Sequence, residues 1–166
     1  HRRSSIAHNI VVRYFVDMSD DLALDRQVCF ALYAASRATT AVYRPLLDEL
    51  GLTYPQYLVM LVLWERDGRG IGEICTELAL DTGTLSPLLK RLGALGFVER
   101  RRLTTDERRV EIFLTEEGKQ LRAKASDIPR TMSGATKMSQ EDLAELRNVL
   151  ARLSDSLHSY TPEDER

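Results

Sequence analysis

Hydrophobic residues recur at helical spacing in several segments of the chain. From Asp25 to Glu49 they return every three or four positions without an intervening glycine, which predicts one long helix, bent near Pro45 and ended by Gly51. The segment Pro55–Arg66 is apolar on nearly every side, so we expect a central, buried helix there. The apolar positions of the first helix are Leu24, Val28, Leu32, Ala35, Val42, Leu46 and Leu50.

Two shorter helical patterns follow a turn at Asp67–Gly70. The first spans Ile71–Ala79, and the second runs to Leu95 with leucines on its inner side. Thr82 or Thr84 is the expected cap of the second helix. The short link between the two helices is typical of a helix-turn-helix corner.

The hydrophobic period then changes to two. Phe97–Arg100 and Arg109–Leu114 alternate like the strands of a hairpin, and the connection Arg101–Arg108 is polar and charged. Thr115 opens a further helix, and a last one spans Ser139–Leu157. A helix-turn-helix followed by a hairpin predicts a winged helix-turn-helix, a mainly α fold with a small β-hairpin wing.

This order of elements divides the chain. We expect residues 51–115 to form the winged helix-turn-helix, and residues 18–50 and 116–160 to form N- and C-terminal dimerisation helices, because amphipathic outer helices need a partner. Residues 161–166 are a polar tail. Residues 1–17 are expected to be an extension from vector or upstream-translated sequence, and the alternative is a native arm that packs on the body.

Composition excludes several classes. The 166 residues are 43% hydrophobic and 29% charged, which is typical of a globular protein rather than a disordered chain. No apolar run approaches the length needed to cross a membrane. The two cysteines, Cys29 and Cys75, lie 46 positions apart without a CxxC or Cys/His cluster. We therefore expect no metal, no cofactor, no disulfide framework and a reducing cytoplasm.

The net charge of −2 hides an uneven distribution. The stretch Ser86–Arg109 holds seven basic and three acidic residues, a net of +4, whereas Thr40–Ala79 has a net of −3. The positive charge falls on the second helix of the helix-turn-helix and on the wing, where DNA phosphates lie in such folds. The pattern predicts a protein that binds double-stranded DNA, and the alternative is a solvated basic face.

Roles follow for the second helix of the corner. Its first residues are the part that reaches base edges in this motif. Lys90 and Arg91 come later, where they suit phosphates, which position the protein without reading sequence. The expected base-reading residues are Thr82, Thr84, Ser86 and Pro87.

The hairpin carries the other expected DNA contacts. Arg108 is placed to enter the minor groove, and Asp106 is placed to hold it by a charge-assisted hydrogen bond. The other basic residues of the hairpin that we expect to contact DNA are Arg100, Arg101, Arg102 and Arg109.

Two motifs make a resemblance specific. The segment DERRVEIFLTEEG, Asp106–Gly118, fits the pattern D-x-R, apolar strand, L-T-x-x-G of the MarR family of winged-helix repressors, which the chain resembles over Leu22–Leu157. The segment LDTGTLSPLLKRLGALGFVERRR is similar to that family's recognition helix and first wing strand. The resemblance implies a homodimer on palindromic operator DNA, with Arg108 in the minor groove oriented by Asp106.

The N-terminal part narrows the resemblance. The segment DRQVCFALYAASRA is similar to the organic-hydroperoxide sensors of that family, the OhrR group. This implies a repressor, not an enzyme, with Cys29 as the sensing thiol. It also implies that Tyr43 and Tyr54 hold the thiolate, with Tyr33 nearby as a third. The tyrosines stand 4, 14 and 25 positions after the cysteine.

The chemistry fits these residue types. A thiolate is the nucleophile, and both a helix N-terminus and phenolic donors stabilise it. Attack on a hydroperoxide gives a sulfenic acid, and losing the thiolate's hydrogen bonds then shifts the dimer off its DNA. Because Thr115–Arg166 contains no cysteine, we expect a mixed disulfide with a low-molecular-weight thiol, a sulfenamide or overoxidation. The apolar neighbours that favour an organic peroxide are Val28, Phe30, Leu32 and Tyr57.

Alternatives remain open. Cys29 can be an inert buried helix cysteine, as we expect for Cys75 on the apolar face of its helix. The same fold can be a repressor relieved by a small aromatic ligand in the crevice between domains. Another class is a thiol peroxidase in which Cys29 turns over, and a third is a dimerisation module without DNA binding.

Overall fold

The computed structural model describes residues 22–103 and 106–160, apart from the side chains of residues 103–109. The expected extension at residues 1–17 and the expected tail at residues 161–166 lie outside the described residues.

The described chain forms two compact units, which meet in sequence between Thr40 and Ala41. In the first unit a short 3-10 helix, η3 (Leu24–Arg26), precedes helix α2 (Val28–Asp48), of which the last eight residues belong to the second unit. The predicted first long helix is confirmed, but it begins at Val28 because Gln27 has an extended backbone.

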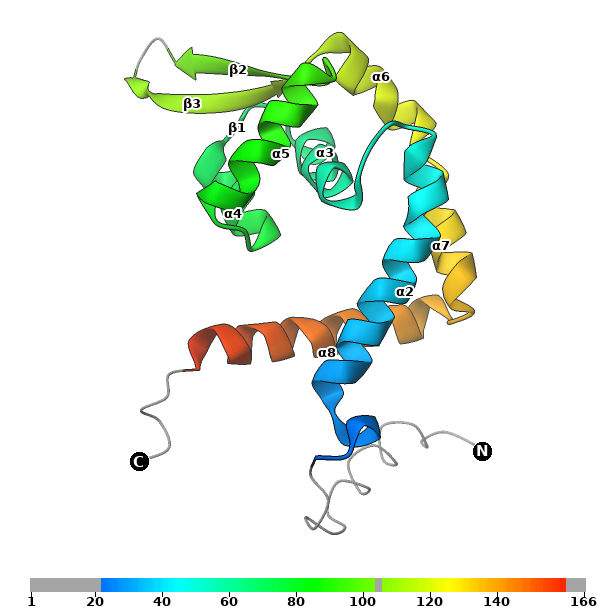
Figure 1. Cartoon of the computed structure of the whole chain (residues 1–166). Coiled ribbons are helices and arrows are strands. Elements are labelled where there is room, and N and C mark those ends of the chain that lie inside the picture. The colour runs from blue at the N-terminus through cyan, green and yellow to red at the C-terminus, as the bar shows by residue number, and fades with distance from the viewer. Residues whose placement is uncertain (1–21, 104–105, 161–166) are drawn as a thin grey trace. The chain divides into compact units, whose positions relative to one another are not determined.

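Helix α3 (Tyr54–Glu65) supplies much of the core of the second unit (Figure 1). Seven of its residues are buried, which confirms the prediction of a central helix. Its start is stabilised locally, because the Thr53 N–H donates to Gln56 Oε1 at 2.8 Å. The core also includes Ile74, Leu85, Leu89, Leu92, Ile112 and Leu114.

Helices α4 (Ile71–Leu78) and α5 (Thr82–Ala94) form the predicted helix-turn-helix. Ala79 ends α4 with a left-handed backbone, φ 51°, and the chain turns into α5 two residues later. Leu85, Leu89 and Leu92 are buried along one side of α5, so its opposite side faces solvent.

The wing is larger than the sequence predicts. Strands β2 (Val98–Leu103) and β3 (Asp106–Leu114) form an antiparallel hairpin, and β1 (Arg69–Gly70) pairs with the other edge of β3. Most of Arg101–Arg108, expected to be an irregular connection, is therefore strand. The part of the hairpin that extends beyond the core has no apolar face to bury. Its sequence therefore lacks the alternation of apolar and polar residues from which a strand is predicted.

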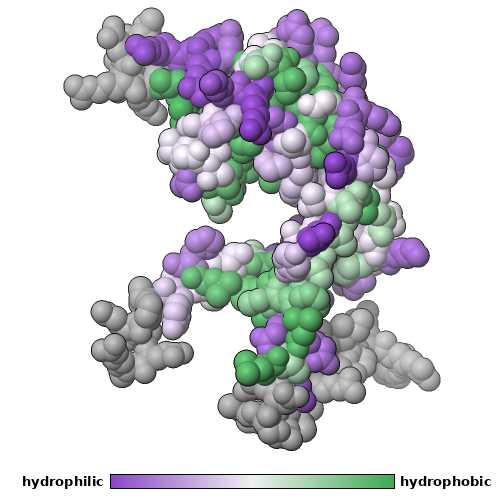
Figure 2. Space-filling view, in the orientation of Figure 1, coloured by the Kyte–Doolittle hydropathy of each residue, from purple (hydrophilic) through white to green (hydrophobic). Residues whose placement is uncertain are grey.

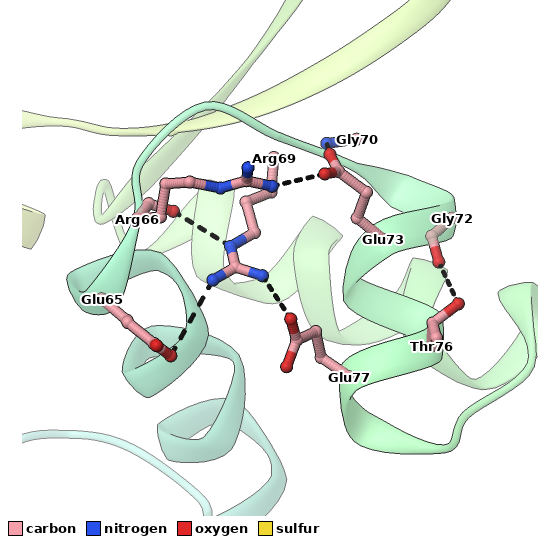
Figure 3. A network of polar contacts seen from close by, with 8 residues as sticks. All are labelled: Glu65, Arg66, Arg69, Gly70, Gly72, Glu73, Thr76 and Glu77. Atoms are coloured by element: carbon pink, nitrogen blue, oxygen red, sulfur yellow. Dashed lines mark hydrogen bonds and ion pairs between the residues drawn. The ribbon is translucent and has the colours of Figure 1, made fainter.

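A buried arginine lies where β1 joins the two helices beside it (Figure 3). Arg69 is 6% exposed, and its guanidinium lies 2.6 Å from Glu77 and 3.8 Å from Glu65. Its Nε donates to the Arg66 carbonyl at 3.3 Å. Arg66 in turn forms an ion pair with Glu73. One side chain thus connects α3, α4 and the edge of the sheet, a position that the sequence analysis expected to be only a turn.

The L-T-x-x-G segment fixes the start of helix α6 (Glu116–Lys124). Thr115 is its N-cap, as predicted, and accepts a hydrogen bond from the Gly118 N–H at 3.1 Å. The indole N–H of Trp64 donates to the Gly118 carbonyl at 2.8 Å. A Cβ on Gly118 would lie 2.0 Å from the Phe97 carbonyl oxygen, so only glycine fits there.

Helices α7 (Ile128–Thr136) and α8 (Gln140–Ser159) complete the described chain. Ser139 caps α8 as predicted, with its hydroxyl accepting from the Asp142 N–H at 3.0 Å. None of the 20 residues of α8 is buried. Figure 2 shows hydrophobic side chains at the surface of the described chain. Those of α8 include Leu146, Val149, Leu150 and Leu157.

Candidate nucleic-acid interface and redox site

The recognition helix α5 is capped by a residue that the sequence analysis missed. Asp81, not Thr82 or Thr84, is the N-cap: its carboxylate accepts from the Thr84 N–H at 2.7 Å and from the Thr84 hydroxyl at 3.0 Å. These two hydrogen bonds hold the pKa of the Asp81 carboxyl below its ordinary value. The prediction was wrong because Asp81, Thr82 and Thr84 stand within four positions and each can cap a helix. Only the backbone geometry determines which of them does so.

The predicted base-reading residues lie on the solvent side of α5. Thr82, Thr84 and Pro87 are exposed and Ser86 is half-buried. The Thr82 hydroxyl also lies 3.9 Å from Cys75 Sγ, a thiol expected in the core and found half-buried against it. The predicted phosphate-binding residues on the same helix, Lys90 and Arg91, are also exposed.

Three consecutive arginines on β2 are exposed but have different surroundings. Arg101 forms an ion pair with Glu99, and its guanidinium carbon lies 4.5 Å from the centroid of the Phe113 ring. Arg100 and Arg102 are on the opposite face of the strand. The other predicted hairpin contacts, Asp106, Arg108 and Arg109, belong to β3, and their side chains lie outside the description.

The first unit carries the predicted sensing thiol. Cys29 is an exposed free cysteine and the second residue of α2. Tyr33 lies one turn further on and is 56% exposed. The Tyr33 oxygen accepts a hydrogen bond from Arg37 Nη1 at 3.0 Å. Arg37 is not among the expected site residues, although its spacing of four from Tyr33 places the two on one helix face.

The second unit gathers four aromatic side chains. The ring centroids of Tyr43 and Tyr54 lie 4.7 Å apart, and those of Tyr43 and Tyr57 lie 5.9 Å apart. Tyr57 meets Trp64 edge to face at 6.2 Å. Burial raises the pKa of Tyr43 to about 12, and the neighbouring Tyr54 and Tyr57 add to the rise. Burial, and then Tyr54, also raise the pKa of Tyr57.

The structure therefore brings together two of the three predicted tyrosines. Tyr43 and Tyr54 are neighbours in the second unit, whereas Cys29 and Tyr33 belong to the first. Tyr57, expected only as an apolar neighbour of the thiol, joins the tyrosine pair through its ring. Phenols are protonated at physiological pH, so Tyr43 and Tyr57, whose pKa values are raised further, each have a proton to donate.

Two findings about the described ranges bear on what these sites can do. Residues 22–103 and 106–160 contain no group of three or more His, Cys, Asp or Glu side chains that could hold a metal ion. The helices among those residues include none long and apolar enough to cross a membrane.

Relatives in sequence are regulators of transcription. The family described as "Transcriptional regulator SarA/Rot" matches residues 41–125. The organic hydroperoxide resistance transcriptional regulator of Bacillus subtilis (strain 168) is 48% identical over 139 residues, 84% of this chain and 95% of the relative. The HTH-type transcriptional regulator TtmR of Methylorubrum extorquens is 50% identical over 140 residues, 84% of this chain and 72% of the relative.

Solved structures agree in fold. Reduced AbfR bound to DNA superposes with a TM-score of 0.71 at 33% identity, covering 86% of this chain and 97% of that one. AbfR of Staphylococcus epidermidis superposes with a TM-score of 0.64 at 35% identity, covering 84% and 94%. The chain belongs to the SarA/Rot and MarR-type family of winged-helix proteins, and it is a DNA-binding transcriptional regulator rather than an enzyme.

Proposed function

We propose that two copies of this chain form a repressor of a peroxide-detoxification gene, released from a palindromic operator when an organic hydroperoxide oxidises Cys29. The observation that carries the proposal is the close pair of Tyr43 and Tyr54, whose ring centroids lie 4.7 Å apart and whose phenols can donate to one acceptor. Such donors suit an anionic sulfur. The identity of 48% to an organic hydroperoxide resistance regulator supports the signal.

The position of Cys29 supports its role. As the second residue of α2, it lies in the first turn, where backbone N–H groups lack intrahelical acceptors and favour an anion. Its exposure gives a peroxide access to the sulfur. Two neighbours of mainly apolar character, Val28 and Phe30, are also exposed and favour an organic rather than a small hydrated peroxide.

The phenols that meet the sulfur come, in this proposal, from the second copy. Cys29 and Tyr43 stand fourteen positions apart on helix α2. An α-helix rises about 1.5 Å per residue, far more over that stretch than a hydrogen bond spans. A pair of chains that exchange these helices would place the thiol of one beside Tyr43 and Tyr54 of its partner, with Tyr33 close to the sulfur on its own helix.

The dimer itself is supported by unburied apolar surface. Helix α8 has no buried residue although it carries a row of leucines and one valine, and α2 exposes Val28, Phe30, Tyr33 and Val42. Apolar faces of this extent mark an interface. Oligomers of this kind are most often two-fold dimers, and two-fold symmetry matches a palindromic operator.

The oxidation step balances without a cofactor. The Cys29 thiolate attacks one peroxide oxygen, so an S–O bond forms and the O–O bond breaks. The leaving alkoxide takes a proton and departs as an alcohol, while sulfur is oxidised by two electrons to a sulfenic acid. A low-molecular-weight thiol then condenses with the sulfenic acid, releasing water and leaving a mixed disulfide. These partners belong to a reducing compartment, so we place the protein in the cytoplasm.

The structures of AbfR support redox control in this fold. They comprise reduced AbfR bound to DNA, overoxidised AbfR bound to DNA and a disulfide-formed AbfR. In this chain Thr115–Arg166 contains no cysteine. Cys75 is half-buried against the core beneath α5. We therefore favour a mixed disulfide at Cys29 over a bond between the two cysteines.

DNA binding is assigned to the solvent side of α5 and to the hairpin. Two recognition helices must lie about 34–36 Å apart to enter successive major grooves. A small rotation at the dimer interface is then enough to release the operator. The proposed contacts on α5 are Thr82, Thr84, Ser86, Pro87, Lys90 and Arg91. Those proposed on the hairpin are Arg100, Arg102, Asp106, Arg108 and Arg109, with Arg101 lying between two of them.

The test compares Cys29→Ser with Cys75→Ser. Fluorescence anisotropy would follow binding to an operator selected from random duplexes by the wild-type protein. Cumene hydroperoxide should release the wild type and Cys75→Ser but leave Cys29→Ser bound. Intact mass should show one added oxygen, or one added thiol, on the released protein only. Release of Cys29→Ser by peroxide would overturn cysteine sensing, while its binding to the operator would leave DNA recognition intact.

A second candidate signal is a small aromatic ligand. A cavity of about 280 Å³ opens between α3 and the α6–α7 segment. Tyr57, Leu61 and Trp64 form its apolar side, and Glu65 and Arg122 add charge. Pockets of this size and lining suit small ligands. Such a ligand would release operator DNA without an oxidant, and equally from Cys29→Ser.

A further inference from the structure

We propose that Arg101 is a positioning residue that fixes the wing against the body of the domain, while Arg100 and Arg102 contact the DNA backbone. The inference rests on the hairpin contact with DNA proposed above and divides its arginines into two roles. Sequence alone treats these three consecutive arginines alike, because all three are the same basic residue. In the structure all three are also exposed.

The pairing of the strands separates them. Successive side chains of a strand point to opposite faces. Glu99 pairs with Phe113 and Arg101 with Glu111, which places these four on one face of the hairpin. On the other face, Val98, Arg100 and Arg102 pair with Leu114, Ile112 and Val110. Val98, Ile112 and Leu114 are buried, so this second face is the one that continues from the core of the domain.

Arg101 is held from two directions. It forms an ion pair with Glu99, two positions earlier on the same face. Its guanidinium also lies over the Phe113 ring, 4.5 Å from the centroid, within the range of a cation–π contact. Both contacts hold the Arg101 side chain against the base of the hairpin. If Arg101 turned toward a DNA phosphate, the ion pair and the cation–π contact would both be lost.

Phe113 carries this hold to the body of the domain. A Cβ built on Gly68 would lie 2.7 Å from Phe113 Cε1, so the ring packs directly on the turn between α3 and β1. Gly68 has φ +70°, a conformation that favours glycine. The carboxylate of Asp67 accepts from the Leu114 N–H at 2.8 Å, which ties the same turn to the strand. Arg101, Phe113 and this turn therefore form one connected brace.

The two arginines of the other face are differently placed. Among the side chains that the structure describes, neither Arg100 nor Arg102 forms an ion pair, whereas Arg101 does. Both are exposed. An arginine that forms no ion pair with a described side chain can offer its charge to phosphates, and each phosphate that it neutralises releases counterions.

Salt dependence separates the two roles. Binding of Arg100→Ala, Arg101→Ala and Arg102→Ala to the selected operator would be measured over a range of salt concentrations. Loss of one phosphate contact reduces the slope of log affinity against log salt by about 0.9. We expect that reduction for Arg100→Ala and Arg102→Ala. Arg101→Ala should keep the wild-type slope and bind about threefold more weakly at every salt concentration.

Footprinting distinguishes positioning from general destabilisation. Hydroxyl-radical footprints of Arg101→Ala should lose protection beneath the hairpin and keep it beneath α5, whereas partial unfolding would weaken both together. Phe113→Leu should give the same footprint, and the double variant should bind no worse than either single one. Arg101→Lys, which keeps the ion pair and a cation over the ring, should restore most of the affinity.

Two results would overturn the inference in distinguishable ways. A slope reduced in Arg101→Ala as much as in Arg100→Ala would make Arg101 a phosphate contact, with hairpin binding intact. If the slope is unchanged in all three variants, the hairpin arginines do not contact DNA phosphates, and the proposed division between them is wrong. That result would leave the proposed binding through α5 unaffected.

Discussion

The ring of Tyr43 lies 4.7 Å from the ring of Tyr54, centroid to centroid, with the two planes inclined by 42°. The two side chains come from the end of α2 and the start of α3. Their packing partly buries Tyr43, and this burial raises its pKa to about 12. The two phenols lie close enough together to donate to a single acceptor, which is the arrangement that a sensor relying on phenolic donors needs.

Tyr43→Phe should remove a late step from the alkaline titration of the tyrosines. The raised pKa means that the fold favours the neutral phenol. The resulting stabilisation is complete below the ordinary pKa near 10 and is lost as pH rises through about 12. Phenolate absorbance against pH should therefore show a late ionisation in the wild type. Tyr160→Phe, which removes an exposed phenol, should retain the full late amplitude, whereas Tyr43→Phe should lose part of it and leave the contribution of Tyr57, whose pKa is also raised. A late amplitude undiminished in Tyr43→Phe would refute the assignment.

Gly118→Ala should destabilise the fold strongly. The new Cβ would lie 2.0 Å from the Phe97 carbonyl oxygen, a backbone atom that cannot move without disturbing the hairpin and the Trp64 hydrogen bond. We expect a loss of about 3 kcal/mol in the free energy of unfolding.

The matched control is Gly134→Ala in helix α7, where a Cβ meets nothing within 4 Å. That change should stabilise the fold by about 0.5–1 kcal/mol, because alanine loses less entropy in a helix. Urea denaturation of both variants provides the measurement. Equal effects would mean that the close approach at Gly118 has no energetic consequence.

Arg69→Met should weaken the junction between the sheet and the two helices beside it. The Arg69 side chain is 7% exposed, and removal of its guanidinium leaves the Arg66 carbonyl and two carboxylates without their donor. Because Glu65 and Glu77 remain largely solvated, we expect a moderate loss of about 1–3 kcal/mol.

Arg130→Met tests whether the burial of the arginine matters. Arg130 also forms an ion pair, with Asp127 at 2.9 Å, but its side chain is 83% exposed. Its loss should change the free energy of unfolding by less than about 0.5 kcal/mol. Urea midpoints of the two variants that shift by the same amount would contradict the role assigned to Arg69.

Local signals predicted much of this fold. Thr115 and Ser139 cap their helices as expected, and the apolar segment of α3 is buried as expected. Capping and hydrophobic periodicity act between residues a few positions apart, so the sequence displays them directly. The prediction failed at Asp81, where several capping residues stand together and only backbone geometry decides between them.

Contacts between distant residues were the harder part. The pairing of Arg69 with Ile112 across the sheet left no periodic signal, because a strand of two residues is too short to show one. The sequence also identified Tyr43 and Tyr54 as a pair only through resemblance. Their contact with each other and with Tyr57 depends on how α2 and α3 pack.

By itself the sequence determined the order of elements, the basic second helix and wing, and the place of a cysteine near the start of a helix, because each depends on residue type and short-range spacing. Only the tertiary structure decided which arginine of the wing is held by Phe113, which glycine admits no side chain and which tyrosines have a raised pKa. These properties arise when atoms from distant parts of the chain exclude water and come within a few ångströms of one another.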